Sequence, residues 1–142
     1  METCIFCRII KGEIPSMKVF ENENVLAFMD IQPINPGHVL VIPKKHAELI
    51  TELDDKITAG LFIAARNLNL ALRKSGIRCE DVNFHLSDGK SAGQEVPHVH
   101  VHVIPRFSGD NFGLRFPPDY RTPKDITKIG KNAGFIQKAL QE

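Results

Sequence analysis

The pattern of apolar and polar residues is most regular at residues 98–104. Three histidines alternate there with three valines, and Ile104 follows. Alternation with a period of two is typical of a half-buried strand, whose successive side chains point to opposite faces. We therefore predict a strand that places His98, His100 and His102 on one face and the valines on the other.

Two stretches have the spacing of helices instead. At residues 54–74, apolar residues recur at intervals of three and four, which predicts a long amphipathic helix. This helix ends at Ser75-Gly76, where glycine can adopt the left-handed conformation that closes a helix. A second helix is predicted from Thr122-Pro123 towards Leu140, with proline at its first position.

Shorter apolar stretches predict the remaining strands. They lie at residues 17–21, 25–29, 38–42 and 82–87. The first two are separated by three polar residues, as in a hairpin. Strands, helix, strands and helix with tight connections indicate an α+β fold with a mainly antiparallel, five-stranded sheet and two main helices. We predict one domain over residues 1–142, with 111–142 as a C-terminal loop and helix.

Composition narrows the class of protein. The chain has 142 residues, of which 42% are apolar and 25% charged, so it can bury an ordinary core. Its net charge of +1 argues against nucleic-acid binding, because Lys44-Lys45 is the only strongly basic pair. We expect no membrane partner, since no long apolar run is present. The three cysteines are an odd number, which argues against a secreted disulfide scaffold, so we expect a cytoplasmic protein.

The histidine face allows three interpretations from the residues alone. It could bind a metal, supply an imidazole as nucleophile or base, or be a polar strand face without chemistry. The loop before the strand, residues 87–97, contains small residues that let backbone N–H groups approach an anion. A phosphate held there would lie against a neutral histidine able to attack phosphorus. This favours a covalent phosphoryl- or nucleotidyl-histidine that water later hydrolyses.

Cys4 and Cys7 form a C-x₂-C pair. Such a pair suits two thiolates on one zinc ion or a redox dithiol. The redox interpretation requires a strand before the motif, and none is predicted there. A zinc site requires two more ligands, for which the candidates are His38, His46, His85 and His98.

Several segments together resemble the histidine triad (HIT) family. Residues 98–104 match its pattern His-φ-His-φ-His-φ-φ, in which φ is apolar. Further segments look like the prokaryotic Hint branch, and they lie at residues 4–7, 12–15, 26–31, 36–46 and 92–97. The resemblance covers residues 4–110. It implies a HIT-like fold, a single HIT domain, a homodimer, and an enzyme that hydrolyses or transfers nucleotides at the α-phosphate.

By position, the resemblance implies roles for the three histidines. His100 would be the nucleophile, His102 would donate to the phosphate, and His98 would support the pair. Attack requires a neutral imidazole with one free nitrogen. We therefore expect the other nitrogen of His100 to donate to a backbone carbonyl, which would fix the tautomer.

The resemblance also implies which residues bind the nucleotide. They are Phe28, Asp30 and Ile31 around the nucleoside, with Asp30 accepting from the ribose hydroxyls, and Ser87, Gly93, Gln94 and Glu95 near the phosphate. Two of them depart from the family pattern, which often has Asn in place of Ser87 and Ser in place of Glu95. Because a carboxylate repels phosphate, we expect the backbone of Glu95 to bind it.

A structural zinc is implied as well, on Cys4, Cys7, His46 and His98. Such a Cys₂His₂ site is closed and leaves no position for water, so no catalytic cofactor is expected. His38 and His85 are interpreted as structural.

The predicted function is hydrolysis or transfer of a nucleoside phosphoramidate or adenylate, with a purine nucleotide as substrate. The alternatives are a dinucleoside polyphosphate hydrolase, or a nucleotide-binding regulatory protein with incidental turnover. An intact His100 favours an enzyme, because binding alone does not require a nucleophile. Residues 108–120 and the C-terminal segment, beyond the resemblance, are expected to determine the leaving group.

Overall fold

The computed structural model describes residues 3–142. Residues 1 and 2, which the single-domain prediction includes, lie outside the described part. The chain forms two compact units, Met1–Asn111 and Phe112–Glu142. The division lies next to residue 110, where the resemblance ends, so the predicted site residues all belong to the first unit.

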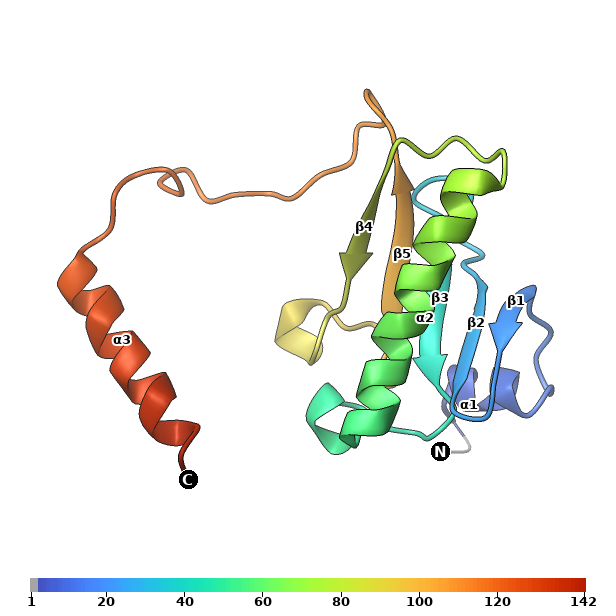
Figure 1. Cartoon of the computed structure of the whole chain (residues 1–142), viewed down its shortest axis with the longest axis horizontal. Helices are drawn as coiled ribbons and strands as arrows, with labels where there is room; N and C mark the ends of the chain where they lie inside the picture. Colours follow the sequence, from blue (N-terminus) through green and yellow to red (C-terminus); the bar gives the residue numbers. More distant parts are fainter. Residues whose placement is uncertain (1–2) are drawn as a thin grey trace. The chain divides into compact units, whose positions relative to one another are not determined.

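The first unit is built on one five-stranded sheet in the order β1-β2-β3-β5-β4 (Figure 1). The strands are β1 (Lys18–Glu21), β2 (Val25–Met29), β3 (Val39–Pro43), β4 (Asp81–His85) and β5 (Val101–Arg106). Every neighbouring pair is antiparallel, which confirms the predicted α+β fold class. The first three strands begin and end within one residue of their predicted limits.

Helix α2 (Asp55–Lys74) covers one face of this sheet (Figure 1). Asp54 caps the helix by accepting the backbone N–H of Ile57. The buried stripe of α2 packs against alternate residues of the central strands, which are Val25, Ala27, Val39, Val41, Val101 and Val103. Burying a valine contributes roughly 1.5–3 kcal/mol, so this core fixes the position of the strands that carry the histidines.

The opposite face of the sheet holds the short helix α1 (Ile5–Ile10). Phe6 and Ile9 of α1 pack against the other set of alternate residues, Leu26, Phe28, Leu40 and Ile42. The sequence pattern does not predict this helix, because six residues without a side-chain cap are too few to show a helical period. His102 is paired with Leu40 across β3 and β5, so it belongs to this second face.

The predicted strand at residues 98–104 begins later than expected, because β5 starts at Val101. Since Val101 pairs with Val41, the register would place Val99 opposite Pro43. Proline has no N–H to continue the ladder. Val99 donates instead to the carbonyl of Ala47 at 2.8 Å. The alternation persists, and the three valines are buried in the core under α2.

Two 3₁₀ turns, η1 (Ile50–Glu52) and η2 (Lys90–Ala92), lie in the loops of the first unit. The second unit contains helix α3 (Ile126–Ala139), which begins later than the predicted Thr122-Pro123 start. Within residues 3–142, no helix combines the length and the apolar character that crossing a bilayer requires.

Candidate functional site

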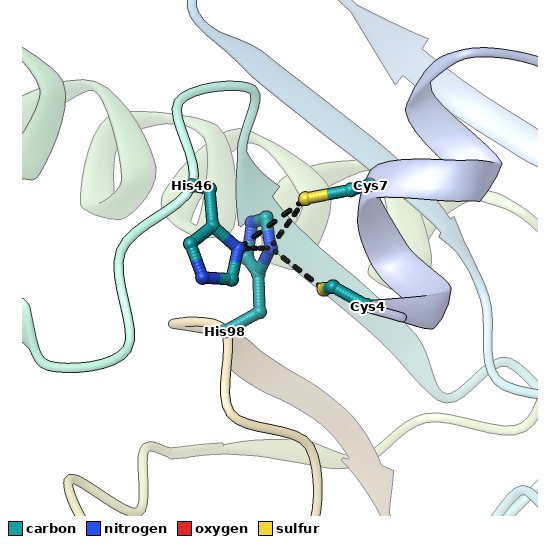
Figure 2. A group of neighbouring side chains, drawn as sticks. All are labelled: Cys4, Cys7, His46 and His98. Carbon is teal, nitrogen blue, oxygen red and sulfur yellow. Dashed lines mark hydrogen bonds between the residues drawn. The ribbon is translucent and has the colours of Figure 1, made fainter. Parts of the chain in front are cut away.

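Four side chains from distant parts of the chain converge beside α1 (Figure 2). Cys4 precedes the helix and Cys7 lies in its first turn, while His46 and His98 come from loops. The nitrogen Nδ1 of His98 is 3.4 Å from Cys4 Sγ and 3.7 Å from Cys7 Sγ. The nitrogen Nδ1 of His46 is 3.3 Å from both Cys7 Sγ and His98 Nδ1. The predicted metal-binding residues therefore form one cluster.

The spacing of these atoms fits a tetrahedral zinc ion. Bonds of about 2.3 Å to sulfur and about 2.0–2.1 Å to nitrogen would separate sulfur from nitrogen by about 3.6 Å, and two nitrogens by about 3.3 Å. His98 donates from Nε2 to the carbonyl of Pro43 at 2.8 Å, so its Nδ1 lone pair faces the cysteines. Burial and the adjacent Cys4 raise the pKa of the Cys7 thiol. A metal ion would therefore displace the thiol proton on binding.

His100 occupies a different environment only two residues away. It is buried, and its ring centroid is 5.3 Å from that of Phe6 and 5.0 Å from that of His102. Its Nδ1 lies 2.7 Å from the carbonyl oxygen of His98. Only an N–H can donate to a carbonyl, so Nδ1 carries the proton and Nε2 keeps a lone pair. The carbonyl partner expected from the sequence is present.

A chain of hydrogen bonds fixes the tautomer of His102 as well. The backbone N–H of Ile34 donates to Nδ1 of His38 at 3.1 Å, so the proton of His38 is on Nε2. That nitrogen lies 2.9 Å from Nδ1 of His102 and donates to it. The proton of His102 is therefore on its own Nε2, which has no acceptor among residues 3–142.

Burial keeps this histidine pair neutral. Burial is the main cause that lowers the pKa of His102 to about 4; the nearby His100, His38 and His85 act in the same direction, and Asp30 opposes them. Burial also lowers the pKa of His38, against the attraction of Asp30, whose Oδ2 is 3.5 Å from His38 Nε2. Near pH 7, His102 thus offers an N–H donor without a positive charge.

The structure changes the interpretation of His38, which the sequence analysis took as structural. His38 supplies the proton that sets the tautomer of His102. A signal for this was present in the sequence. His38 precedes Leu40 by two residues, so alternation places both on the sheet face that carries His102.

The loop of residues 87–95 is bound to the loop of residues 47–50. The side-chain amide of Gln94 donates to the Glu48 carbonyl and accepts from the Gly89 N–H, both at 2.8 Å. In this structure the Gln94 side chain therefore holds the loop, although the resemblance implied contact with the phosphate.

Backbone donors in this loop are also partly occupied. Gly93 has a left-handed φ of 89°, and its N–H donates to the Lys90 carbonyl at 3.0 Å. The N–H of Gln94 donates to the carbonyl of Gly89 at 3.2 Å. In the described chain, the N–H of Glu95 has no acceptor, and this residue is exposed. The backbone of Glu95 is therefore available to an anion.

The remaining predicted residues lie in different surroundings. Phe28 is buried against Phe6, with ring centroids 5.6 Å apart, whereas Ile31 is 92% exposed. Asp30 accepts the N–H of Gln32 at 2.8 Å through Oδ1. Ser87 is buried, and its hydroxyl oxygen is within hydrogen-bonding distance of His85, whose ring lies beside that of His102.

The chain matches the HIT domain family model over residues 11–109. A crystal structure from Streptococcus mutans UA159 is 41% identical, covers 99% of this chain and 87% of its own, and superposes with a TM-score of 0.89. A Zn-bound histidine triad family protein from Mycobacterium smegmatis is 35% identical, with 99% of both chains covered and a TM-score of 0.76. Adenosine 5'-monophosphoramidase hnt1 of Schizosaccharomyces pombe is 37% identical over 130 residues, which are 91% of this chain and 94% of that protein. This chain belongs to the histidine triad (HIT) family.

Proposed function

We propose that this protein hydrolyses a nucleoside phosphoramidate or adenylate at the α-phosphate, with His100 as the nucleophile. The observation that carries the proposal is the hydrogen bond from His100 Nδ1 to the His98 carbonyl, which leaves the Nε2 lone pair free. Further support comes from the relative hnt1, which is named as an adenosine 5'-monophosphoramidase.

The reaction would proceed in two steps. His100 Nε2 attacks phosphorus, a P–N bond forms, and the leaving group departs with the bonding electron pair and takes a proton from water. The ring becomes positively charged, and its Nδ1–H remains on the His98 carbonyl, which stabilises that charge. His102 donates its Nε2–H to a phosphate oxygen. Water then attacks phosphorus and gives up one proton to the solvent, the P–N bond breaks with its electron pair returning to Nε2, and the nucleoside monophosphate leaves with His100 restored.

In this proposal zinc is structural and is held by Cys4, Cys7, His46 and His98. Four protein ligands close the site, and the ion would attach α1 to the loop before β5. The related protein from Mycobacterium smegmatis is Zn-bound. His98 would then support catalysis through its main-chain carbonyl, because its side chain serves the metal.

We also propose that two copies form a homodimer through α2 and β4. The outer side of α2 exposes Phe62, Ile63 and Leu70, with 46%, 50% and 55% of each residue accessible. β4 is an edge strand, whose unpaired backbone groups can bind a second chain. Exposed apolar patches commonly mark interfaces. Light scattering that finds only monomer at micromolar concentration would contradict this arrangement.

Rapid quenching with an adenylate substrate radiolabelled in the α-phosphate tests the mechanism. We expect acid-labile label on the protein, mapped to His100, and none on the His100→Ala variant. The His102→Ala variant is the control, since it keeps the attacking atom and should still accumulate label. Label on another residue would refute the assignment. Comparing kcat/KM for adenosine phosphoramidate, lysyl-adenylate and diadenosine polyphosphates would then identify the leaving group.

A further inference from the structure

His85 stands at the end of β4, directly opposite His102 in the antiparallel pair of β4 and β5. Opposed residues of such a pair project to the same face of a sheet. Their ring centroids are 5.8 Å apart. The sequence alone suggests a structural role for His85, yet this residue lies on the face that carries the proposed chemistry.

Ser87 connects this histidine to the loop that precedes β5. It is buried, and its Oγ lies 3.0 Å from His85 Nε2. Gly93 is also nearby, because a Cβ added there would lie 3.9 Å from the same oxygen. The hydroxyl therefore lies close both to His85 and to the loop that the sequence predicts to approach a phosphate.

A serine hydroxyl has one proton, so the direction of its bond to His85 decides what it can offer. If Ser87 donates to His85, no proton remains for a ligand. If His85 donates from Nε2 to Ser87 Oγ, the hydroxyl proton is free to point elsewhere. A phosphate oxygen is an acceptor only, so it requires the second arrangement.

We propose that His85 is a positioning residue that donates to Ser87 Oγ and so directs the Ser87 hydroxyl proton onto an oxygen of the bound α-phosphate. The inference rests on the proposed function, because it takes the phosphate to be held beside His100. The proposal explains why His85 and Ser87 are hydrogen-bonded to each other, since without His85 the direction of the Ser87 hydroxyl proton would not be fixed.

Asparagine provides a matched comparison at position 87. Its amide N–H₂ carries two protons and reaches further than a serine hydroxyl, so it can donate to a phosphate oxygen without help from His85. The contribution of His85 should therefore depend on which residue occupies position 87. A purely structural role of His85 in β4 would not depend on it.

The test compares His85→Leu in the natural protein and in the Ser87→Asn background, with adenosine phosphoramidate as substrate. We expect kcat/KM to fall about tenfold in the natural background, the loss typical of one hydrogen bond to a charged group. In the Ser87→Asn background we expect a change of less than about twofold. His85→Gln keeps an N–H donor and should restore most of the loss in the natural background. Thermal melting of each variant checks that it is folded.

Equal losses in both backgrounds, or no rescue by His85→Gln, would overturn the inference, and so would full activity of His85→Leu in the natural protein. His100→Ala is measured in the same assay. If His100→Ala is inactive and His85→Leu is fully active, only the role of His85 fails. If His100→Ala turns over like the natural protein, the proposed function fails and this inference fails with it.

Discussion

Two clusters of histidines lie on the same side of the sheet, and their ring nitrogens are bonded in opposite ways. In the first, Nδ1 atoms of His46 and His98 face inward towards two cysteines. In the second, His100 and His102 each have one nitrogen bound to the protein and leave Nε2 without a partner in the described chain. The first arrangement suits a closed metal site, and the second suits a site that accepts a substrate.

The difference depends on where each ring places its proton. His98 donates from Nε2 to the Pro43 carbonyl, which leaves Nδ1 for a metal. His100 donates from Nδ1 to the His98 carbonyl, which leaves Nε2 free for the attack that we propose. Residue type alone therefore does not separate a ligand from a nucleophile, since the backbone acceptor beside each ring selects its tautomer.

The largest expected effect separates turnover from metal binding. His100→Ala removes the attacking nitrogen, and we expect kcat to fall about a thousandfold or more while nucleotide binding survives. Zinc content should stay at about one ion per chain, because His100 is not among the four proposed zinc ligands. His102→Ala should cost less than His100→Ala, since it removes a donor and not the bond-forming atom. Steady-state kinetics with elemental analysis of the same samples measures both, and near-native turnover of His100→Ala would contradict the account.

At the proposed zinc site we expect the opposite result, in which metal binding is lost and turnover survives. Replacing Cys4 and Cys7 together by Ser should abolish zinc binding and lower Tm by about 10 °C or more, because structural zinc contributes on the order of 10 kcal/mol to folding. Below that Tm, catalysis should still be measurable. Cys79→Ser is the matched control, since this thiol donates to the Asp81 carbonyl and lies outside the group of Cys4, Cys7, His46 and His98. Absence of zinc from protein purified without chelator would disprove the metal assignment.

A smaller effect concerns stability at acid pH. Because burial lowers the pKa of His102 from 6.5 to about 4, the unfolded chain takes up this proton before the folded chain does. The contribution of neutral His102 is complete above about pH 6.5 and is lost as pH falls towards 4. Between those values, Tm should fall more steeply for the natural protein than for His102→Gln, which cannot be protonated. If Tm falls with pH equally for both proteins, burial does not lower the pKa of His102 as described.

Alternation and helical spacing were enough to predict most of the fold. The alternation of Val99, Val101 and Val103 identifies the buried face of the strand. Apolar residues at intervals of three and four within residues 54–74 locate α2. Pro43 marked the end of β3, but its effect on the start of β5 required the register. Periodicity describes each element by itself and cannot state which residues of two strands are opposite.

The candidate site was predicted less completely than the fold, for the same reason. The resemblance assembled Cys4, Cys7, His46 and His98, which the structure brings together. Alternation places His38 on the same sheet face as Leu40, but its contact with His102 depends on the pairing of β3 with β5, and the contact of His85 with Ser87 depends on a turn. The side-chain role of Gln94 could not be predicted either, since one of its partners, the Glu48 carbonyl, lies in a loop far away in the sequence.

The most direct test of the central claim is the tautomer of each histidine in the folded protein with zinc bound. Long-range ¹H–¹⁵N spectra of protein with ¹⁵N-labelled histidine distinguish protonated from unprotonated ring nitrogens, and single-histidine variants assign the signals. We predict the proton on Nε2 of His98 and on Nδ1 of His100, with His102 protonated on Nε2. If His100 carries its proton on Nε2 instead, it has no lone pair facing the substrate, and the proposed nucleophile is contradicted.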